Sequence, residues 1–414
     1  METVVFHGTK AAQPRLIKYI IREDGLLRKL QGGRLSFRGW VGVSCVLMVL
    51  CLMSAPQMTT APANAAGEET KEEGNAPVVS AYIYDRAGLV IRDEDAQYMT
   101  QMNFSFALIK AGRVSGDHWV SIDTFKDYIS RHPQILPVMA VGGWGADGFS
   151  QAAATEAGRA AFVESALELM EEHGFLGIDI DWEYPGSSVA GIESRKDDPD
   201  HLILLLQALR AALNEKTALD GRRRVLSVAV GGSKQYADRL DCEAIGALAD
   251  QVNVMTYDLR GAEKVTGHHT CLYPQTGDES GIGAAAAMEA FREAGIPGEK
   301  LMMGAAFYGR AWRGVESGAN DGLGQKAQTS GNKSYGYDKI LELMDGGDFT
   351  RYWDAGAMAP FLFDGSTFIS YEDPQSIAVK GAYALQNGLL GIMFWEYGQD
   401  SSGTLVRALY EALR

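Results

Sequence analysis

The chain has 414 residues, 46% of them hydrophobic, which is enough for one large domain or two of ordinary size. Its formal net charge of −15 argues against nucleic acid as a partner, because a polyanion would be repelled. The charge is uneven: residues 1–65 carry eight Lys or Arg and three acids, so the remainder has 30 basic and 50 acidic side chains. The first segment is therefore distinct from the rest.

Residues 1–65 have the pattern of a signal peptide. A basic region ends at Arg38, an apolar run extends over residues 40–55, and Ala63-Asn64-Ala65 supplies the small residues that precede a cleavage site. The apolar run is shorter than the about 20 residues that a membrane-spanning helix needs. We therefore expect a secreted, extracellular protein. An uncleaved N-terminal membrane anchor is the alternative.

A short linker, residues 66–77, leads to a long region of alternating patterns. Apolar runs of strand length recur eight times, with helical patterns such as 156–172 and 200–215 between them. Eight strands that alternate with helices predict an α/β fold, a (β/α)8 TIM barrel, rather than an open sheet. The expected strands are 78–84, 103–109, 135–141, 175–182, 225–230, 251–257, 301–307 and 389–395.

The fourth expected strand carries three acids on one face. Side chains alternate along a strand, so Asp179, Asp181 and Glu183 project to one side and the intervening apolar residues to the other. Such neighbours cannot all ionise at low cost in a partly desolvated cleft, so at least one keeps its proton near neutral pH. Glycoside hydrolysis requires a protonated carboxyl group beside an ionised one. Glu183, just before Pro185, is the candidate for the protonated acid. A solvated sheet face and a calcium site are the alternatives.

The interval between the seventh and eighth expected strands is about 80 residues, far longer than one helix requires. Residues 312–371 are rich in Gly, polar and aromatic residues, and we expect them to form a small α+β insertion that walls one side of the cleft. A disordered loop is the alternative, but the aromatic side chains favour burial. Residues 78–311 and 372–414 would then be the two parts of a catalytic barrel.

Aromatic and polar residues follow several other strands. The carboxyl ends of barrel strands meet at one mouth, where a barrel carries its chemistry. Sugars have apolar faces edged with hydroxyls, so an aromatic mouth with carboxyl and guanidinium groups suits a glycan. Each motif taken alone is equally consistent with packing or turn formation. The motifs are Gly142-Gly143-Trp144, Met255-Thr256-Tyr257-Asp258, Phe307-Tyr308-Gly309-Arg310 and Met393-Phe394-Trp395-Glu396.

The acid strand, closed by Trp182-Glu183-Tyr184-Pro185, resembles the active-site strand of glycoside hydrolase family 18, the chitinases. The resemblance extends from Val78 to Arg414 and is strongest to bacterial chitinases with the α+β insertion. It implies cleavage of β-1,4 bonds in chitin or N-acetylglucosamine oligosaccharides, with no metal or organic cofactor. We expect a monomer. Further matching motifs are Gly267-His268-His269-Thr270, Leu272-Tyr273 and the stretch from Tyr371 to Lys380.

The resemblance also implies roles for single residues. Glu183 would be the acid and later the base, and the 2-acetamido oxygen of the bound sugar would be the nucleophile. Asp181 would hold the acetamide, Tyr257 would hydrogen-bond its oxygen, and Asp179 would share the proton. Contacts with the sugar are implied for a larger set: Tyr82, Gly143, Trp144, Tyr184, Met255, Asp258, Tyr308, Arg310, Trp353 and Trp395.

Two positions depart from the family pattern. Leu176 stands where the family usually has Asp, and strand parity places it on the face away from the acids. Ala140 stands where the family usually has Ser, whose hydroxyl resembles a donor to ionised Asp179. We expect Tyr82 or an ordered water to compensate incompletely, so that Ala140→Ser would raise kcat and move the acidic limb of the pH profile downward.

Two rival functions share this fold. A glycan-binding lectin of the family typically lacks the acid that Glu183 supplies here. A cell-wall or spore-coat N-acetylglucosaminidase that cuts peptidoglycan stays open. No repeat or wall-binding module is visible in the sequence, and the insertion with its aromatic residues fits linear chitin better.

The exported form is predicted to begin near Ala66, because Ala63-Asn64-Ala65 follows the apolar run. N-terminal sequencing of protein recovered from the culture medium measures this directly. A chain that still carries Met1 or Arg15 would instead indicate a membrane anchor.

Overall fold

The computed structural model describes residues 18–20, 28–30, 76–316, 318 and 320–414. The chain divides into two compact units, residues 1–72 and 73–414. In the first unit, β1 (Lys18–Ile20) and β2 (Arg28–Leu30) pair antiparallel. The rest of the predicted signal peptide, and the predicted linker up to residue 75, lie outside the described residues. In the described part of the chain, no helix combines the length and the apolar character that crossing a bilayer requires.

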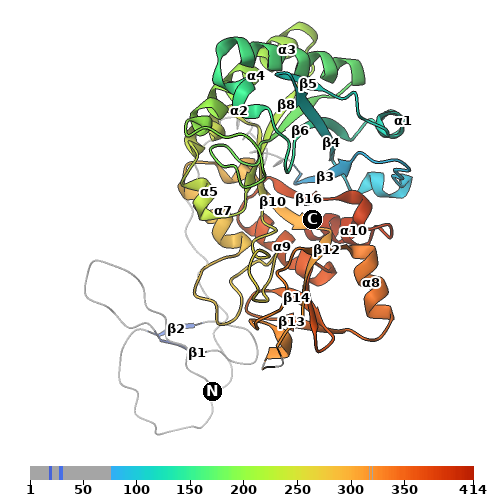
Figure 1. Cartoon of the computed structure of the whole chain (residues 1–414), viewed down its shortest axis with the longest axis vertical. Coiled ribbons are helices and arrows are strands. Elements are labelled where there is room, and N and C mark those ends of the chain that lie inside the picture. Colours follow the sequence, from blue (N-terminus) through green and yellow to red (C-terminus); the bar gives the residue numbers. More distant parts are fainter. Residues whose placement is uncertain (1–17, 21–27, 31–75, 317, 319) are drawn as a thin grey trace, which may run out of the picture. The chain divides into compact units, whose positions relative to one another are not determined.

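Eight parallel strands close into a barrel in the second unit, which confirms the predicted TIM barrel (Figure 1). The ring closes because β3 pairs with both β16 and β4. A short strand, β5 (Arg113–Ser115), extends β4 as an antiparallel hairpin. The barrel strands are β3 (Val78–Tyr84), β4 (Gln101–Lys110), β6 (Leu136–Gly142), β7 (Gly177–Asp181), β8 (Val225–Gly231), β9 (Gln251–Met255), β10 (Leu301–Ala306) and β16 (Gly391–Trp395).

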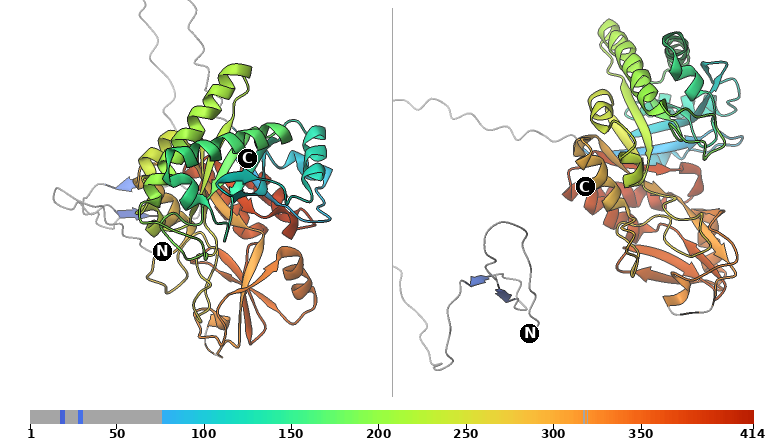
Figure 2. Two further views of the ribbon diagram at one scale, coloured as in Figure 1. Left: turned by 45° about the horizontal axis from the view of Figure 1, so that its top comes forward. Right: turned by 60° about the vertical axis from the view of Figure 1, so that its left-hand side comes forward.

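Helices cover the outside of the barrel, and local sequence signals set their ends (Figure 2). The helix α4 has Pro199 in its first turn and stops at Gly221, which adopts a left-handed φ of 72°. Asp373 and Ser376 form a capping box at the start of α9. The helices are α1 (Ile122–Arg131), α2 (Phe149–Ala154), α3 (Glu156–His173), α4 (Asp198–Asp220), α5 (Lys234–Ala237), α6 (Cys242–Leu248), α7 (Ala284–Glu293), α8 (Tyr337–Asp345), α9 (Pro374–Gln386) and α10 (Thr404–Ala412).

The barrel strands separate two apolar clusters. Ile178 and Ile180 of β7 pack in the large core between the strands and the helices. A smaller cluster, which includes Ala140, Met302 and Met393, fills the interior of the barrel. Because residues alternate along β7, its odd-numbered positions face that interior. The predicted parity of the acid strand is therefore confirmed.

Between β10 and β16 the chain forms an antiparallel sheet of its own, which confirms the α+β insertion. The sheet carries an apolar cluster that includes Trp312, Phe361 and Phe368. The helix α8 packs against β11 and β12 and contributes Tyr337 and Ile340 to the large core. The sheet begins at Tyr308, ahead of the predicted boundary at 312, because the chain enters β11 directly after Phe307. In the order β12-β11-β15-β14-β13, its strands are β11 (Tyr308–Arg313), β12 (Lys333–Gly336), β13 (Thr350–Asp354), β14 (Ala359–Phe363) and β15 (Thr367–Ser370).

A buried ion pair joins the end of the insertion to the barrel. Glu372, which precedes α9, forms an ion pair with Lys380 of α9, and each side chain is only 1% exposed. The Lys380 ammonium also donates to Thr270 Oγ1 at 2.6 Å, and Thr270 in turn donates to the carbonyl of Thr256 at 3.1 Å. The pair therefore supports the chain just before Tyr257. Cys242 and Cys271 are free buried thiols.

Lys380→Met is expected to lower the free energy of unfolding by about 3–5 kcal/mol, because it leaves the Glu372 carboxylate buried without its partner. Urea unfolding followed by circular dichroism measures the change. Lys234→Met is the matched control, since Lys234 forms an exposed pair with Asp238. Equal effects of the two substitutions would contradict a structural role for the buried pair.

Candidate active site

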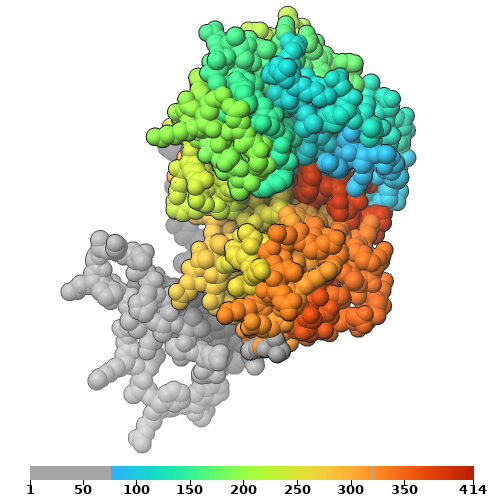
Figure 3. All heavy atoms as spheres, in the orientation of Figure 1, coloured from blue at the N-terminus to red at the C-terminus, as the bar shows by residue number. Residues whose placement is uncertain are grey.

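The three predicted acids lie at the carboxyl end of β7. Asp179 and Asp181 are buried in the barrel interior, and Glu183 is 9% exposed. Glu183 lies two residues beyond the strand rather than in it, because the partner strand β6 ends at Gly142. The surface is indented between the barrel and the insertion, with C-terminal residues at the floor of the indentation (Figure 3). Carboxyl groups with different degrees of burial therefore follow one another along one strand.

Asp179 is held by three donors inside the barrel. Tyr82 donates to its Oδ2 at 2.7 Å, while Ser227 and Asn253 donate to its Oδ1 at 2.5 and 3.0 Å. Burial raises the pKa of Asp179, and these hydrogen bonds oppose the increase. The expectation that Ala140 leaves Asp179 short of a donor is therefore wrong, because β8 supplies the hydroxyl that β6 lacks.

Asp181 and Glu183 are placed to keep a proton. Burial raises the pKa of Asp181, and the neighbouring carboxylates of Glu183 and Asp179 raise it further. Its Oδ1 is buried and has no hydrogen-bond partner among the residues that the structure describes. Burial also raises the pKa of Glu183 to about 7, and the negative charge of Asp258 adds to the increase. A hydrogen bond from Tyr184 lowers the pKa but does not cancel the increase. A protonated Glu183 is therefore available up to near-neutral pH.

The loop after β6 brings the backbone close to the acids. Gly142 and Gly143 have φ values of 117° and 90°, in the left-handed region. A Cβ at Gly142 would lie 2.1 Å from the carbonyl oxygen of Asp181, and one at Gly143 would lie 2.6 Å from the Phe106 ring. The Gly143 amide instead donates to the Asp181 carbonyl at 2.8 Å. Only glycines fit this turn, which carries Trp144 to the mouth.

Asp258, which follows β9, has two basic neighbours. Arg310 donates to both of its oxygens, at 2.7 and 2.5 Å, and His269 Nδ1 lies 3.4 Å from Oδ1. Partial desolvation would raise the pKa of Asp258, but His269 and Arg310 hold it below its usual range. Asp258 therefore remains an anion beside Tyr257. In the sequence, His269 stands out only as part of the motif Gly267-His268-His269-Thr270. Its contact with Asp258 could not be predicted, because the fold brings these two residues together.

Aromatic rings line both sides of the acids. Trp395 stacks on Phe106 with ring centroids 5.5 Å apart, and Tyr84 meets its edge at 6.0 Å. Trp144, which is 63% exposed, lies 6.4 Å from Tyr184 between ring centroids. The predicted rings of Trp144, Tyr184 and Trp395 thus lie at the site. Sequence patterns did not single out Phe106 and Tyr84, although both lie at or near the end of a barrel strand.

Four residues expected to contact a sugar are placed differently. Tyr82, Met255 and Tyr308 are largely buried, to much the same degree as Asp181 and Glu183, so their contacts with a sugar stay predictions. Trp353 lines a separate cavity of about 590 Å³ with Tyr352, and none of the three acids is among its described lining residues. The sequence placed these residues near strand ends or in the insertion, but burial depends on packing that the local pattern does not encode.

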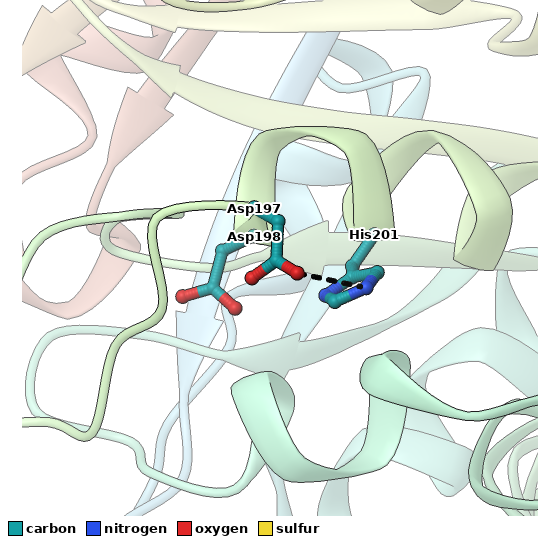
Figure 4. A group of neighbouring side chains, drawn as sticks. All are labelled: Asp197, Asp198 and His201. Atoms are coloured by element: carbon teal, nitrogen blue, oxygen red, sulfur yellow. Dashed lines mark ion pairs between the residues drawn. The ribbon is translucent and has the colours of Figure 1, made fainter.

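The calcium alternative has little support at the acids, because three donors already occupy the oxygens of Asp179. Within the described part of the chain, Asp197, Asp198 and His201 at the start of α4 bring metal-ligand atoms together (Figure 4). Asp198, however, accepts from Ser150 Oγ at 2.7 Å and from the Arg195 amide at 2.6 Å. This group therefore fastens the start of α4.

Comparisons with known proteins agree with this geometry. The profile of Glycosyl hydrolases family 18 matches residues 69–400. Chitinase A1 of Niallia circulans is 35% identical over 321 residues, which are 71% of this chain and 46% of that protein. Chitinase B of Serratia marcescens is 28% identical over 388 residues and 76% of each chain. A solved family 18 N-acetylglucosaminidase from Paenibacillus barengoltzii has 40% identity and a TM-score of 0.78, covering 81% of this chain and 99% of that one.

Proposed function

The chain belongs to glycosyl hydrolases family 18, and from this premise we propose that it hydrolyses β-1,4 bonds between N-acetylglucosamine units of chitin or its oligosaccharides. The observation that carries the proposal is the pair of carboxyl groups after β7. Glu183 has its pKa raised to about 7, and Asp181 beside it has a buried oxygen with no hydrogen-bond partner among the described residues. The proton that Glu183 retains and the hydrogen-bond acceptor on Asp181 thus lie close together at the mouth of the barrel, which aromatic side chains line.

In the first step, Glu183 gives its proton to the leaving oxygen as the bond from that oxygen to the anomeric carbon breaks. The acetamide oxygen of the same sugar forms the new bond to that carbon, which gives a cyclic oxazolinium ion. Asp181 Oδ1 accepts the acetamide N–H, and Tyr257 donates to the acetamide oxygen. Glu183, now a carboxylate, then takes a proton from the water that attacks the anomeric carbon, and this restores the acetamide and the acid.

The walls of the site fit a chain of sugars. Trp395, stacked on Phe106, offers a flat face for the reacting sugar, and the exposed Trp144 offers one for a neighbouring sugar. Asp258 and Arg310 face the same mouth with both hydrogen-bond acceptors and donors. We also propose that the protein is secreted, on the basis of the signal-like pattern of residues 1–65. We propose in addition that it acts as a monomer.

A second candidate is an N-acetylglucosaminidase that releases single sugars from chain ends. The similarity to the Paenibacillus N-acetylglucosaminidase, over nearly all of that chain, favours it. Product analysis on chitotetraose and colloidal chitin separates the two, because a chitinase yields oligosaccharides and the second enzyme yields mainly the monosaccharide. Purified peptidoglycan, offered in parallel, tests the cell-wall alternative.

Glu183→Gln is expected to fold normally and to lose on the order of 10²–10⁴-fold in kcat, because an amide cannot give a proton to the leaving oxygen. Rates on chitotetraose at pH 6 or so measure the loss. Glu164→Gln is the matched control, since Glu164 lies on the surface of α3 and pairs with Arg113. A Glu183→Gln enzyme that keeps half of the wild-type rate would end the assignment.

The acetamide of the substrate is expected to be the nucleophile, because Asp179 is occupied by three donors and lies beneath the mouth. A thiazoline analogue of N-acetylglucosamine oligomers should inhibit, and a fully deacetylated oligomer should remain uncut. Mass spectrometry of the enzyme quenched during turnover provides the opposite test. A glycosyl ester trapped on Asp179 or Asp181 would refute substrate assistance.

A further inference from the structure

A pocket of about 230 Å³ lies at the amino ends of three barrel strands. The second half of α4, the end of α6 and the segments that lead into β8, β9 and β10 form its walls. Because Glu183 follows the carboxyl end of β7, the pocket and the acids are at opposite ends of the barrel. The polar residues of the lining include Arg210, Asn214, Arg223, Arg224, Asp250 and Lys300.

The pocket concentrates positive charge. Four of its lining side chains are basic, and only Asp250 is acidic. A second acid, Asp220, pairs with Arg224 at 2.7 Å, so four positive charges face two negative ones and the group has a net charge of +2. The whole chain, in contrast, has a formal net charge of −15. Like charges that share one pocket repel each other, so an anion would be stabilised there.

Asp250 compensates only part of this charge. It accepts hydrogen bonds from Arg210 at 2.8 Å and from Arg223 at 3.1 Å. It also accepts from the amide of Leu226 at 2.9 Å, so it fastens α4 to the start of β8. One carboxylate is thus shared by two guanidinium groups and cannot neutralise both.

Lys300, which precedes β10, has no acidic partner in the described part of the chain. Its ammonium donates to the carbonyl oxygens of Gly246 and Ala249, at 2.6 and 2.9 Å. An ammonium has three donors, so one more is available. The fold therefore uses the hydrogen bonds of Lys300 and leaves its charge without a carboxylate.

The arginines of the pocket also retain donors. The Arg223 side chain is 75% exposed and makes one hydrogen bond, to Asp250, where a guanidinium can donate five. The Nε atoms of Arg210 and Arg224 are buried and have no hydrogen-bond partner among the described residues. Donors are thus in excess of acceptors at this pocket, as positive charge is.

We propose that the pocket binds a phosphate group, either as inorganic phosphate or as a monoester carried by a larger molecule. A phosphate monoester has a charge of about −1.5 to −2 at neutral pH, which matches the net charge of the group. Its oxygens point in several directions, so it can accept from α4, from the segment before β8 and from Lys300 at once. A carboxylate offers two oxygens in one plane. Arginine and lysine are both established phosphate-binding side chains.

The place of the pocket separates this site from catalysis. A ligand at the amino ends of the strands leaves the mouth at the carboxyl ends open. A phosphate that belongs to a larger molecule would therefore hold the protein without covering the acids. Because binding is the readout, the test below does not depend on the hydrolytic function proposed above.

Titration calorimetry with inorganic phosphate, at neutral pH and low ionic strength, measures binding to the purified protein. We expect one saturable site per chain. Arg223→Ala should weaken the affinity by about tenfold or more, the loss of a hydrogen bond to a charged group. Arg222→Ala is the matched control, since Arg222 is an exposed neighbour outside the pocket lining. It should change the affinity by less than about threefold, because only a screened, long-range attraction is lost.

A second variant, Lys300→Gln, removes the charge from the other side of the pocket and keeps donors for the two carbonyl oxygens. It should also weaken phosphate binding by about tenfold. Glycerol 3-phosphate, titrated in parallel, separates the two sources. Equal affinity for both probes supports a phosphate on a larger molecule, and binding of inorganic phosphate alone supports the free ion.

Two results would overturn the proposal. One is a wild-type protein that shows no saturable binding of either probe. The other is an Arg223→Ala protein that binds phosphate as tightly as Arg222→Ala does. Thermal unfolding shows whether each variant folds, and phosphate should raise Tm more for Arg222→Ala than for Arg223→Ala. If Lys300→Gln does not fold, the comparison of the two exposed arginines decides.

Discussion

The constraint on which this active site depends is the burial of three carboxyl groups in one short stretch of chain. In a medium of low polarity, like charges this close cannot all persist, and each needs a different environment. Asp179 has donors, Asp181 has an oxygen without a described partner, and Glu183 is largely buried with the anionic Asp258 nearby. The same chemical group, a carboxyl, therefore has a supporting, a receiving and a proton-donating position within five residues of sequence.

The insertion takes part in this arrangement because it begins where a barrel strand ends. Arg310 belongs to β11 of the insertion, yet it fixes Asp258, which follows β9 of the barrel. Further along the chain after Asp258, Thr270 accepts a hydrogen bond from Lys380, which forms the buried ion pair with Glu372. The insertion and the chain around Tyr257 and Asp258 are thus parts of one hydrogen-bonded structure, and the insertion does more than cover the barrel.

Much of the fold followed from the sequence, because the signals it depends on are local. Eight apolar runs and the parity of the acid strand require only the period of a strand, and the structure confirms them. The supporting residues could not be found in this way. Ser227 and Asn253 meet Asp179 only because β7, β8 and β9 align in one register, and no pattern within a strand contains that register. The burial of Tyr82, Met255 and Tyr308 escaped for the same reason.

The error at Ala140 shows why a missing motif residue is weak evidence of a missing interaction in a closed barrel. Every interior side chain has a neighbour on each side in the sheet and others across the barrel. A hydroxyl lost from β6 can therefore be supplied by β8 without any change in the backbone, and here it is. What the chemistry fixes is the number and direction of donors at Asp179. The strand that provides each donor is free to vary as long as its register places it beside that carboxylate.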